Sequence, residues 1–484
     1  MKTGIVSLLL LFSCQILYAQ GNQGFEEFRS QMMKDFHTFR KGVLEDYTDF
    51  LNGIWKDYQL FKSGKPDSIP KPLQAPTVET IPDTSPVVLP DAPERPVKPD
   101  NPVVGKPVVD KPIFAKPLQP DVPIVSPVSK DIDIDYYGVS IKVPNRIFKT
   151  SGNGLSRNQI ANYWKKLEEN HWEQVSKILL EYKKKYNYND FMYYLLVNEY
   201  VRMVEPDAEK RCVQKLFLMV YSGYDARIAY HNETLVLMLP FANQIYACTY
   251  ILQNGIKYYL FPEEELAGKG MISTYEITTK QNDLRVLYTN VLDNPHLAVS
   301  AKSFNLSDGV LTISGTVNEF LMGLLFDLPQ MNNELYALPI LDESCRKPIV
   351  DSLRKQLEGK TKLEALQALM HFMHYAFEYA TDQEQFGKEK PFFFEELLYY
   401  PECDCEDRSV FFAYLVRNVL DLECHLLDFP GHIAVAVAID GAKGTYYMHN
   451  GKRFYITDPT YIGASVGDCM PDYRGVNPKI LLLK

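Results

Sequence analysis

The chain has 484 residues, of which 46% are apolar and 13% aromatic. At roughly 100 to 200 residues per domain this is enough for two to four packed units, which excludes a wholly disordered polypeptide. A formal net charge of −10 provides no basic field for phosphates, so we expect no nucleic-acid function. The only long apolar run lies at the start of the chain, and no transmembrane segment is predicted.

Residues 1–19 have the pattern of a secretion signal. Lys2 is followed by the apolar run Ile5–Phe12, and the small Ala19 precedes a plausible cleavage point. We therefore expect an exported protein, in the periplasm or on the cell surface of a bacterial envelope. A lipid anchor at Cys14 is the weaker alternative, because the bulky Phe12 stands where such sites favour small residues.

Residues 20–63 contain an aromatic repeat with a period of 11. Eleven residues over three turns is close to the pitch of a straight helix, so one continuous apolar stripe results. We predict an amphipathic helix that self-associates or docks onto the body of the protein. The repeated positions are Phe25, Phe36, Tyr47 and Tyr58, and three places later Phe28, Phe39, Phe50 and Phe61.

Residues 64–130 form a proline-rich linker. Of the 31 prolines in the chain, 17 lie between Pro66 and Pro127. Such a stretch has few residues to build a core and favours extended polyproline II structure. We expect a semi-rigid spacer between the helix and the globular part.

The globular part begins with a predicted α+β domain over residues 131–270. A strand at 131–138 and a helical region to about residue 220 precede strands at Thr234–Pro240, Gln244–Gln253 and Lys257–Phe261. Asn254-Gly255 is a strong signal for a two-residue hairpin turn. Residues 271–345 alternate like β-structure and are predicted to form a separate small β unit.

Residues 346–484 repeat the order of the first domain. We predict helices at 363–379 and 404–419, then strands at 432–439, 444–449 and 452–457, with a second hairpin turn at Asn450-Gly451. The first domain is therefore expected to be a degenerate copy of the last. It has no histidine at the head of its central strand, and Phe261-Pro262 stands where the last domain has Asp458-Pro459.

Three residues of the last domain suggest nucleophilic catalysis. Cys405 opens a predicted helix, whose positive end favours a thiolate. His432 heads a strand with small residues on one face, which lets that helix approach. Asp458 ends the neighbouring hairpin strand and is placed to orient the imidazole.

The sequences around these residues resemble the transglutaminase-like superfamily, which has a papain-type fold. The blocks are Asp404 to Asp407, Gly431-His432 and Tyr455 to Thr460, and the stretch from Tyr379 to Gly387 is similar to bacterial transglutaminase-like cysteine proteinases. The resemblance implies a catalytic triad of Cys405, His432 and Asp458 that acts on amide bonds of a protein or peptide and requires no cofactor. Gln385 is the candidate for a side chain in the oxyanion hole.

Three carboxylates, Asp404, Glu406 and Asp407, surround the nucleophile, and their charges oppose a thiolate. A hard cation such as Ca²⁺ would remove this conflict, and the resemblance includes relatives that use an acidic cluster in this way. The simpler interpretation, which we favour from the sequence, is that Asp404 caps the helix and pairs with Arg408 four residues later.

Two features leave a non-catalytic alternative open. Cys403 stands where many members of the superfamily have glycine, and a Cys403–Cys405 disulfide would mask the nucleophile. Ala434 stands where many have an aromatic residue. The alternative is an exported binding or assembly protein that keeps the fold without turnover. Seven cysteines follow the signal segment, and their pairing cannot be deduced.

Overall fold

The computed structural model describes residues 131–146, 155–232, 234–263, 271–275, 287, 295–337, 341–400 and 402–483, together with the backbone of 55–59. The secretion signal, the proline-rich linker and most of the aromatic helix predicted from the sequence lie outside these residues. The described part mixes helices and antiparallel sheets, which confirms the α+β class.

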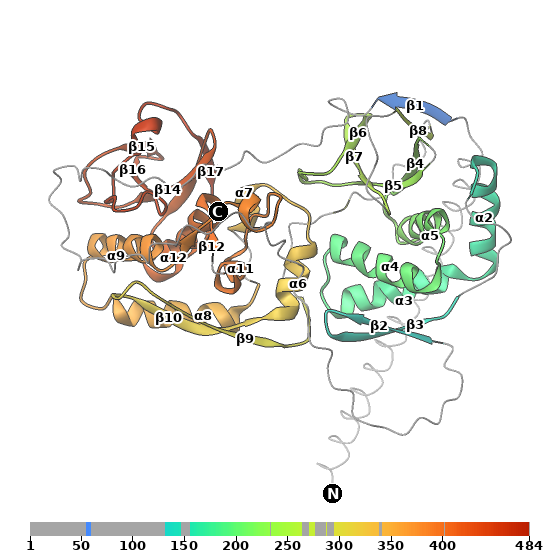
Figure 1. Cartoon of the computed structure of the whole chain (residues 1–484), viewed down its shortest axis with the longest axis horizontal. Coiled ribbons are helices and arrows are strands. Elements are labelled where there is room, and N and C mark those ends of the chain that lie inside the picture. Colours follow the sequence, from blue (N-terminus) through green and yellow to red (C-terminus); the bar gives the residue numbers. More distant parts are fainter. Residues whose placement is uncertain are drawn as a thin grey trace, which may run out of the picture.

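The first unit combines a hairpin, four helices and a sheet (Figure 1). The hairpin pairs β2 (Asp131–Tyr136) with β3 (Val139–Pro144). The helices are α2 (Arg157–Glu169), α3 (Trp172–Lys185), α4 (Asp190–Val204) and α5 (Ala208–Tyr221). The strands that follow are β4 (Arg227–His231), β5 (Thr234–Pro240), β6 (Tyr250–Gln253) and β7 (Ile256–Phe261).

Two strands at the edge of this sheet correct the predicted boundaries. β8 (Met271–Tyr275) pairs with β4, so the residues expected to open a separate β unit belong to the first sheet. β1 (Trp55–Gln59) pairs with β8, so the predicted helix over 20–63 is wrong at these five positions. An open sheet edge offers backbone hydrogen bonds to an added strand, and this pairing overrides helical periodicity.

The second unit begins with the hairpin of β9 (Ala301–Ser307) and β10 (Thr312–Asn318). α6 (Glu319–Asp327) and α7 (Asn333–Tyr336) follow within the region predicted to be β-rich, so that prediction holds only for the hairpin. Asn318 caps α6 by accepting the Phe320 N–H, which marks the change from strand to helix.

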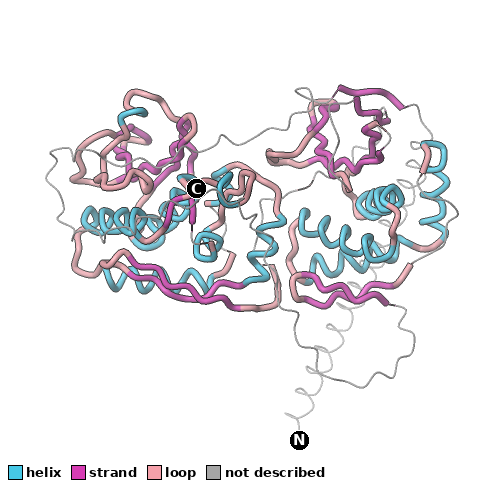
Figure 2. Tube along the Cα trace, viewed as in Figure 1, coloured by secondary structure: helices cyan, strands magenta, loops and turns pink. Residues whose placement is uncertain are grey.

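The rest of the second unit places a long helix beneath a five-stranded sheet (Figures 1 and 2). Its helices are α8 (Glu343–Gln356), α9 (Lys362–Tyr375), α10 (Asp382–Gln385), α11 (Phe394–Tyr399) and α12 (Cys405–Val419). Short β11 (Glu378–Tyr379) and β12 (Glu402–Cys403) pair in parallel. The sheet contains β13 (Cys424–Phe429), β14 (His432–Ala438), β15 (Tyr446–His449), β16 (Lys452–Thr457) and β17 (Lys479–Leu482).

The two units share one topology. Strands β4-β5-β7-β6 of the first unit and β13-β14-β16-β15 of the second follow the same order, and each set comes directly after a helix, α5 or α12. Both Asn-Gly turns have positive φ at Asn254, Gly255, Asn450 and Gly451, as a tight hairpin requires. This shared order supports the expected duplication.

The first unit lacks the chemical groups of the second. The first residue of α5 is Ala208, where α12 has Cys405, and β5 begins at Thr234, where β14 begins at His432. Counted from the Asn-Gly turn, Pro262 takes the place of Asp458, one residue later than the Phe261 expected from the sequence. The first unit therefore keeps the strand order without a cysteine, a histidine or an aspartate at these three positions.

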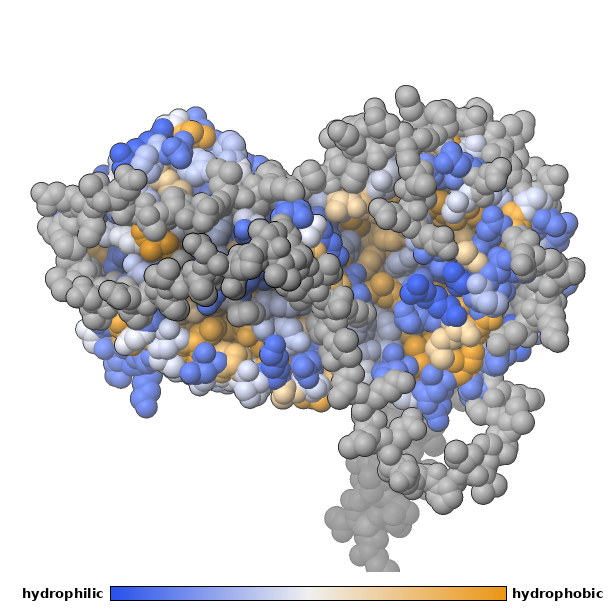
Figure 3. Space-filling view, viewed as in Figure 1, coloured by the Kyte–Doolittle hydropathy of each residue, from blue (hydrophilic) through white to orange (hydrophobic). Residues whose placement is uncertain are grey.

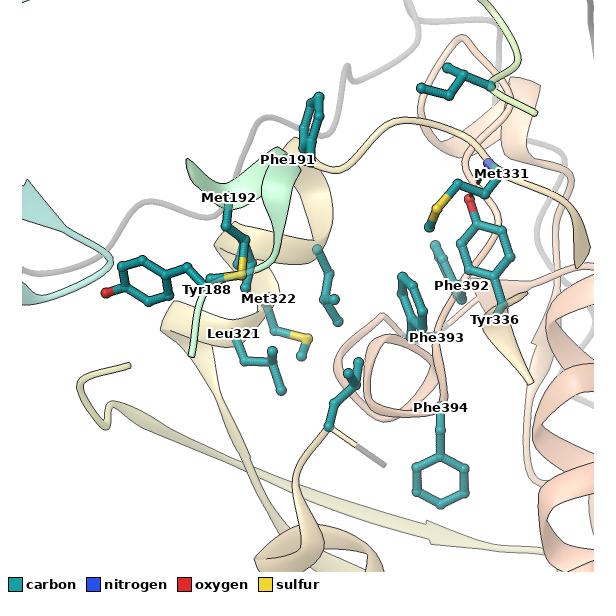
Figure 4. Close-up of a cluster of buried hydrophobic side chains, with 14 of the residues drawn as sticks. Tyr188, Phe191, Met192, Leu321, Met322, Met331, Tyr336, Phe392, Phe393 and Phe394 are labelled. Carbon is teal, nitrogen blue, oxygen red and sulfur yellow. Dashed lines mark hydrogen bonds between the residues drawn. The ribbon is translucent and has the colours of Figure 1, made fainter. Parts of the chain in front are cut away.

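The units pack against each other through a continuous apolar core. Side chains from α4, including Phe191 and Met192, lie near Leu321 and Met322 of α6 and the aromatic run 392–394 (Figure 4). Apolar residues are also visible at the junction of the units in the space-filling view (Figure 3). Within the described ranges, no helix combines the length and apolar character needed to span a membrane.

Candidate active site

Cys405 is the first residue of α12 and lies against the head of β14. Phe411 and Leu415 of the helix share a buried core with the strand residues Ile433, Val435 and Val437. The alanines of the strand belong to a different cluster on its other face, so the predicted approach of the helix to the small-residue face is wrong. The Ser409 hydroxyl donates to the Ile433 carbonyl at 2.9 Å, and the Ile433 backbone acts to lower the pKa of Cys405. The start of α12 is thereby held next to the residue that follows His432.

His432 and Asp458 form a buried hydrogen-bonded pair. Nε2 of His432 and Oδ2 of Asp458 are 2.8 Å apart. The other oxygen of Asp458 accepts the Thr460 N–H at 2.9 Å, the Thr460 hydroxyl at 2.7 Å and the Tyr461 N–H at 3.2 Å. Burial raises the pKa of Asp458, but His432 and Thr460 more than offset this and hold it below its ordinary value.

The environment of the thiol differs from the sequence expectation. The Cys405 S–H donates to Glu406 Oε2 at 3.6 Å, and within the described part it has no hydrogen bond with His432. Burial, followed by the charges of Glu406 and Asp404, raises the pKa of Cys405 well above its ordinary value. The helix terminus was expected to favour the thiolate, but desolvation and two neighbouring carboxylates outweigh the dipole of one helix end.

Five carboxyl side chains lie close together near the Cys405 thiol. Asp382 and Glu389 join the three predicted residues, and all five side chains are buried. Oxygen atoms of Asp382, Asp404 and Asp407 lie within 4.8 Å of one another, and so do those of Asp382, Glu389 and Glu406. Burial and mutual repulsion raise the pKa of Asp382, Asp404 and Glu406 well above the ordinary range, while burial raises that of Asp407 to about 7.

The sequence interpretation of Asp404 holds for its position but not for its pairing with Arg408. Asp404 is the N-cap residue of α12, and its N–H donates to Asp407 Oδ2 at 3.2 Å. Neither of its carboxylate oxygens has a hydrogen-bond partner among the described residues, although the side chain is fully buried. Arg408 does not pair with it, because the guanidinium donates to the Phe377 carbonyl and to the Cys403 sulfur. Buried carboxylates without donors fit a hard, oxygen-binding divalent cation, which would supply the missing positive charge.

Gln385 and Cys403, the two other residues named from the sequence, have hydrogen-bond partners away from Cys405. Gln385 is buried on α10 and donates to the Ala380 carbonyl at 3.5 Å. No hydrogen bond joins it to Cys405, His432 or Asp458 in the described part, so its oxyanion role stays a prediction. Cys403 binds other partners than Cys405: its sulfur accepts from Arg408 at 3.4 Å and its S–H donates to the Glu378 carbonyl. All seven described cysteines are free thiols.

Sequence reasoning missed two side chains that touch the His432–Asp458 pair. Tyr473 stacks on the His432 ring, with centroids 5.1 Å apart and planes 13° apart. His374 Nε2 donates to the Asp458 carbonyl at 3.0 Å, while its Nδ1 accepts the Gly463 N–H at 3.4 Å. Both are far from His432 in the sequence, and no local pattern places them beside it. His371, three residues before His374, pairs with Asp308 at 2.6 Å.

Comparisons with family models, with curated proteins and with solved structures find no match for this chain.

Proposed function

We propose that the protein is a transglutaminase-like cysteine peptidase or acyl transferase that acts on amide bonds of proteins or peptides. The observation that carries the proposal is the 2.8 Å pair of His432 and Asp458, with Cys405 at the start of the helix that the Ser409–Ile433 hydrogen bond ties to the residue after His432. A thiol, an imidazole and a buried carboxylate in this order support attack on an acyl carbon.

The proposed reaction has two halves. Cys405 loses its proton to His432 and attacks the amide carbonyl; the C–N bond breaks, and the leaving amine takes the proton from His432. Water, or an amine in the case of transfer, then attacks the thioester and regenerates the thiol. Because Nε2 of His432 is bound to Asp458, Nδ1 remains as the nitrogen that can serve Cys405.

A divalent cation such as Ca²⁺ is a proposed addition to this site. Asp404, Glu406 and Asp407 would hold it, with Asp382 and Glu389 as further oxygen donors. When bound, the cation would compensate the negative charge that opposes ionisation of the nearby thiol. Glu406 accepts the Cys405 S–H at Oε2, and its Oε1 has no hydrogen-bond partner among the described residues. Oε1 could therefore bind the cation.

The test is the reactivity of Cys405 toward iodoacetamide at pH 7, followed by mass spectrometry of its peptide. We expect labelling faster than that of a free cysteine, and a decrease of about 100-fold in His432→Ala, which removes the base. His449→Ala, on β15 of the same sheet, is the matched control and should label like the parent. Equal rates in the parent, His432→Ala and free cysteine would refute a catalytic site.

A binding or assembly protein without turnover is the second proposal. It is favoured by the raised pKa of Cys405 and by the thiol contact with Glu406 in place of His432. Labelling that stays slow both with and without millimolar Ca²⁺ would support it. We further propose export to the bacterial envelope, with the segment 25–61 serving docking or self-association.

A further inference from the structure

A pocket opens beside His432 at the junction of the two units. His432 and Ile433 of the second unit line it on one side, and Met331 and the start of α7 on another. Among the described residues of the first unit, Tyr246 contributes to the lining. A substrate bound at Cys405 would therefore meet this pocket directly next to the proposed base.

Tyr246 is fixed in place by two contacts across the junction. Its backbone N–H donates to the Gln330 carbonyl at 3.0 Å, and its hydroxyl donates to Asn332 Oδ1 at 2.8 Å. These bonds hold the loop between β5 and β6 of the first unit against the segment that precedes α7. The first unit thus supplies an aromatic side chain to the lining beside the proposed active site.

The charged residues that line the pocket are mostly acidic. Glu334 and Asp428 are two of them, and Glu406, the third carboxyl residue, belongs to the cluster near Cys405. Lys479 is the one cation among the described residues of the lining. Lys479 pairs with Asp428 in strand register but is exposed, and no ion pair within 4 Å joins them in the described structure. Burial raises the pKa of Asp428, Lys479 lowers it, and Glu334 raises it, so the two carboxylates repel each other across the pocket.

The lining also has an apolar part. Met331, Phe429 and Leu481 are all buried, while Asn332 and Asn333 are neutral polar residues of the same lining. An aliphatic stem would pack on these residues, and a positively charged end would lie near Glu334 and Asp428 and over the Tyr246 ring. A carboxylate end would meet like charges, and a neutral end would leave the acidic groups uncompensated.

We propose that this pocket is a subsite for a cationic side chain of the substrate, a lysine or arginine next to the amide that Cys405 attacks. The subsite rests on the proposed function, since it is defined by its position beside His432. The first unit then contributes to substrate specificity. Its Tyr246 completes a binding site that is otherwise formed by the second unit, which also carries Cys405 and His432.

The experiment measures inactivation of the full chain by Nα-acetyl chloromethyl ketones of lysine, norleucine and glutamate, with alkylation located at Cys405. Norleucine has the aliphatic stem of lysine without its charge. We expect lysine to react at least about tenfold faster than norleucine, and glutamate to be slowest. In the double variant Glu334→Gln/Asp428→Asn the lysine and norleucine rates should become equal.

The control is Glu358→Gln/Asp440→Asn, which removes two exposed carboxylates away from the pocket and changes the net charge equally. It should keep the preference for lysine. Tyr246→Ala should reduce the lysine rate while sparing that of iodoacetamide. Rapid but equal labelling by all three ketones would overturn the subsite alone, whereas labelling no faster than that of free cysteine would overturn the proposed function and the subsite with it.

Discussion

Asp458→Asn distinguishes this site from triads that function with asparagine. The Oδ1 atom of Asp458 accepts three hydrogen bonds, two of them from backbone N–H groups of Thr460 and Tyr461 that cannot turn away. An asparagine must place its carbonyl oxygen there, so its NH₂ group faces Nε2 of His432. The imidazole must then accept at Nε2 and carry its proton on Nδ1, which is the wrong tautomer for a base toward Cys405.

The magnitude follows from these bonds. Turning the amide around to restore the tautomer would forfeit the three bonds at Oδ1, at about 1 kcal/mol each. About 3 kcal/mol corresponds to roughly a 150-fold preference for the unproductive orientation. We therefore expect alkylation of Cys405 by iodoacetamide at pH 7 to slow by about 100-fold in Asp458→Asn.

The control is Asp468→Asn, which alters a buried carboxylate of the same C-terminal region that binds the Ser465 N–H at 2.8 Å. Its alkylation rate should match that of the parent. The tautomer itself is read from the ¹⁵N chemical shifts of His432. Alkylation of Asp458→Asn within about twofold of the parent, with the proton still on Nε2, would refute the reasoning.

Three other outcomes are expected. Burial lowers the pKa of His374 to about 4, whereas the unfolded chain has an ordinary histidine pKa of about 6.5. The free energy of unfolding should therefore be unaffected by this group above pH 6.5 and should fall by up to about 3 kcal/mol as the pH decreases to 4. Urea unfolding of His374→Gln should lack this loss, and an unchanged pH profile would contradict it. Ca²⁺ at 100 times its Kd should stabilise the parent by about 2.7 kcal/mol in thermal unfolding and leave Asp407→Ala unaffected; a parent that does not respond excludes the cation. Arg346→Met leaves Glu395, its partner at 2.5 Å, buried without its counterion and should cost about 3 to 5 kcal/mol in urea unfolding, whereas Lys347→Met, which breaks an exposed pair, should cost under about 1 kcal/mol.

Local sequence patterns predicted most of the elements that position the site. The strand Thr234–Pro240 and the hairpin strand Lys452–Thr457 have the predicted bounds, and α12 begins one residue from its predicted start. These elements are local in origin, because an Asn-Gly turn or a periodic apolar stripe depends on residues close together in the chain. The pairing of β1 with β8 is non-local, and the prediction for residues 55–59 failed there.

The sequence by itself determined the residue types of the site: a cysteine at a helix start, a histidine at a strand head and an aspartate after a hairpin. Only the tertiary structure decided their electrostatics. Folding buries Asp404 without donors, adds Asp382 and Glu389 to the carboxylates near Cys405, and directs the thiol toward Glu406. A pKa depends on every charge and dipole within several ångströms in a poorly solvated interior, and those neighbours come from distant parts of the chain.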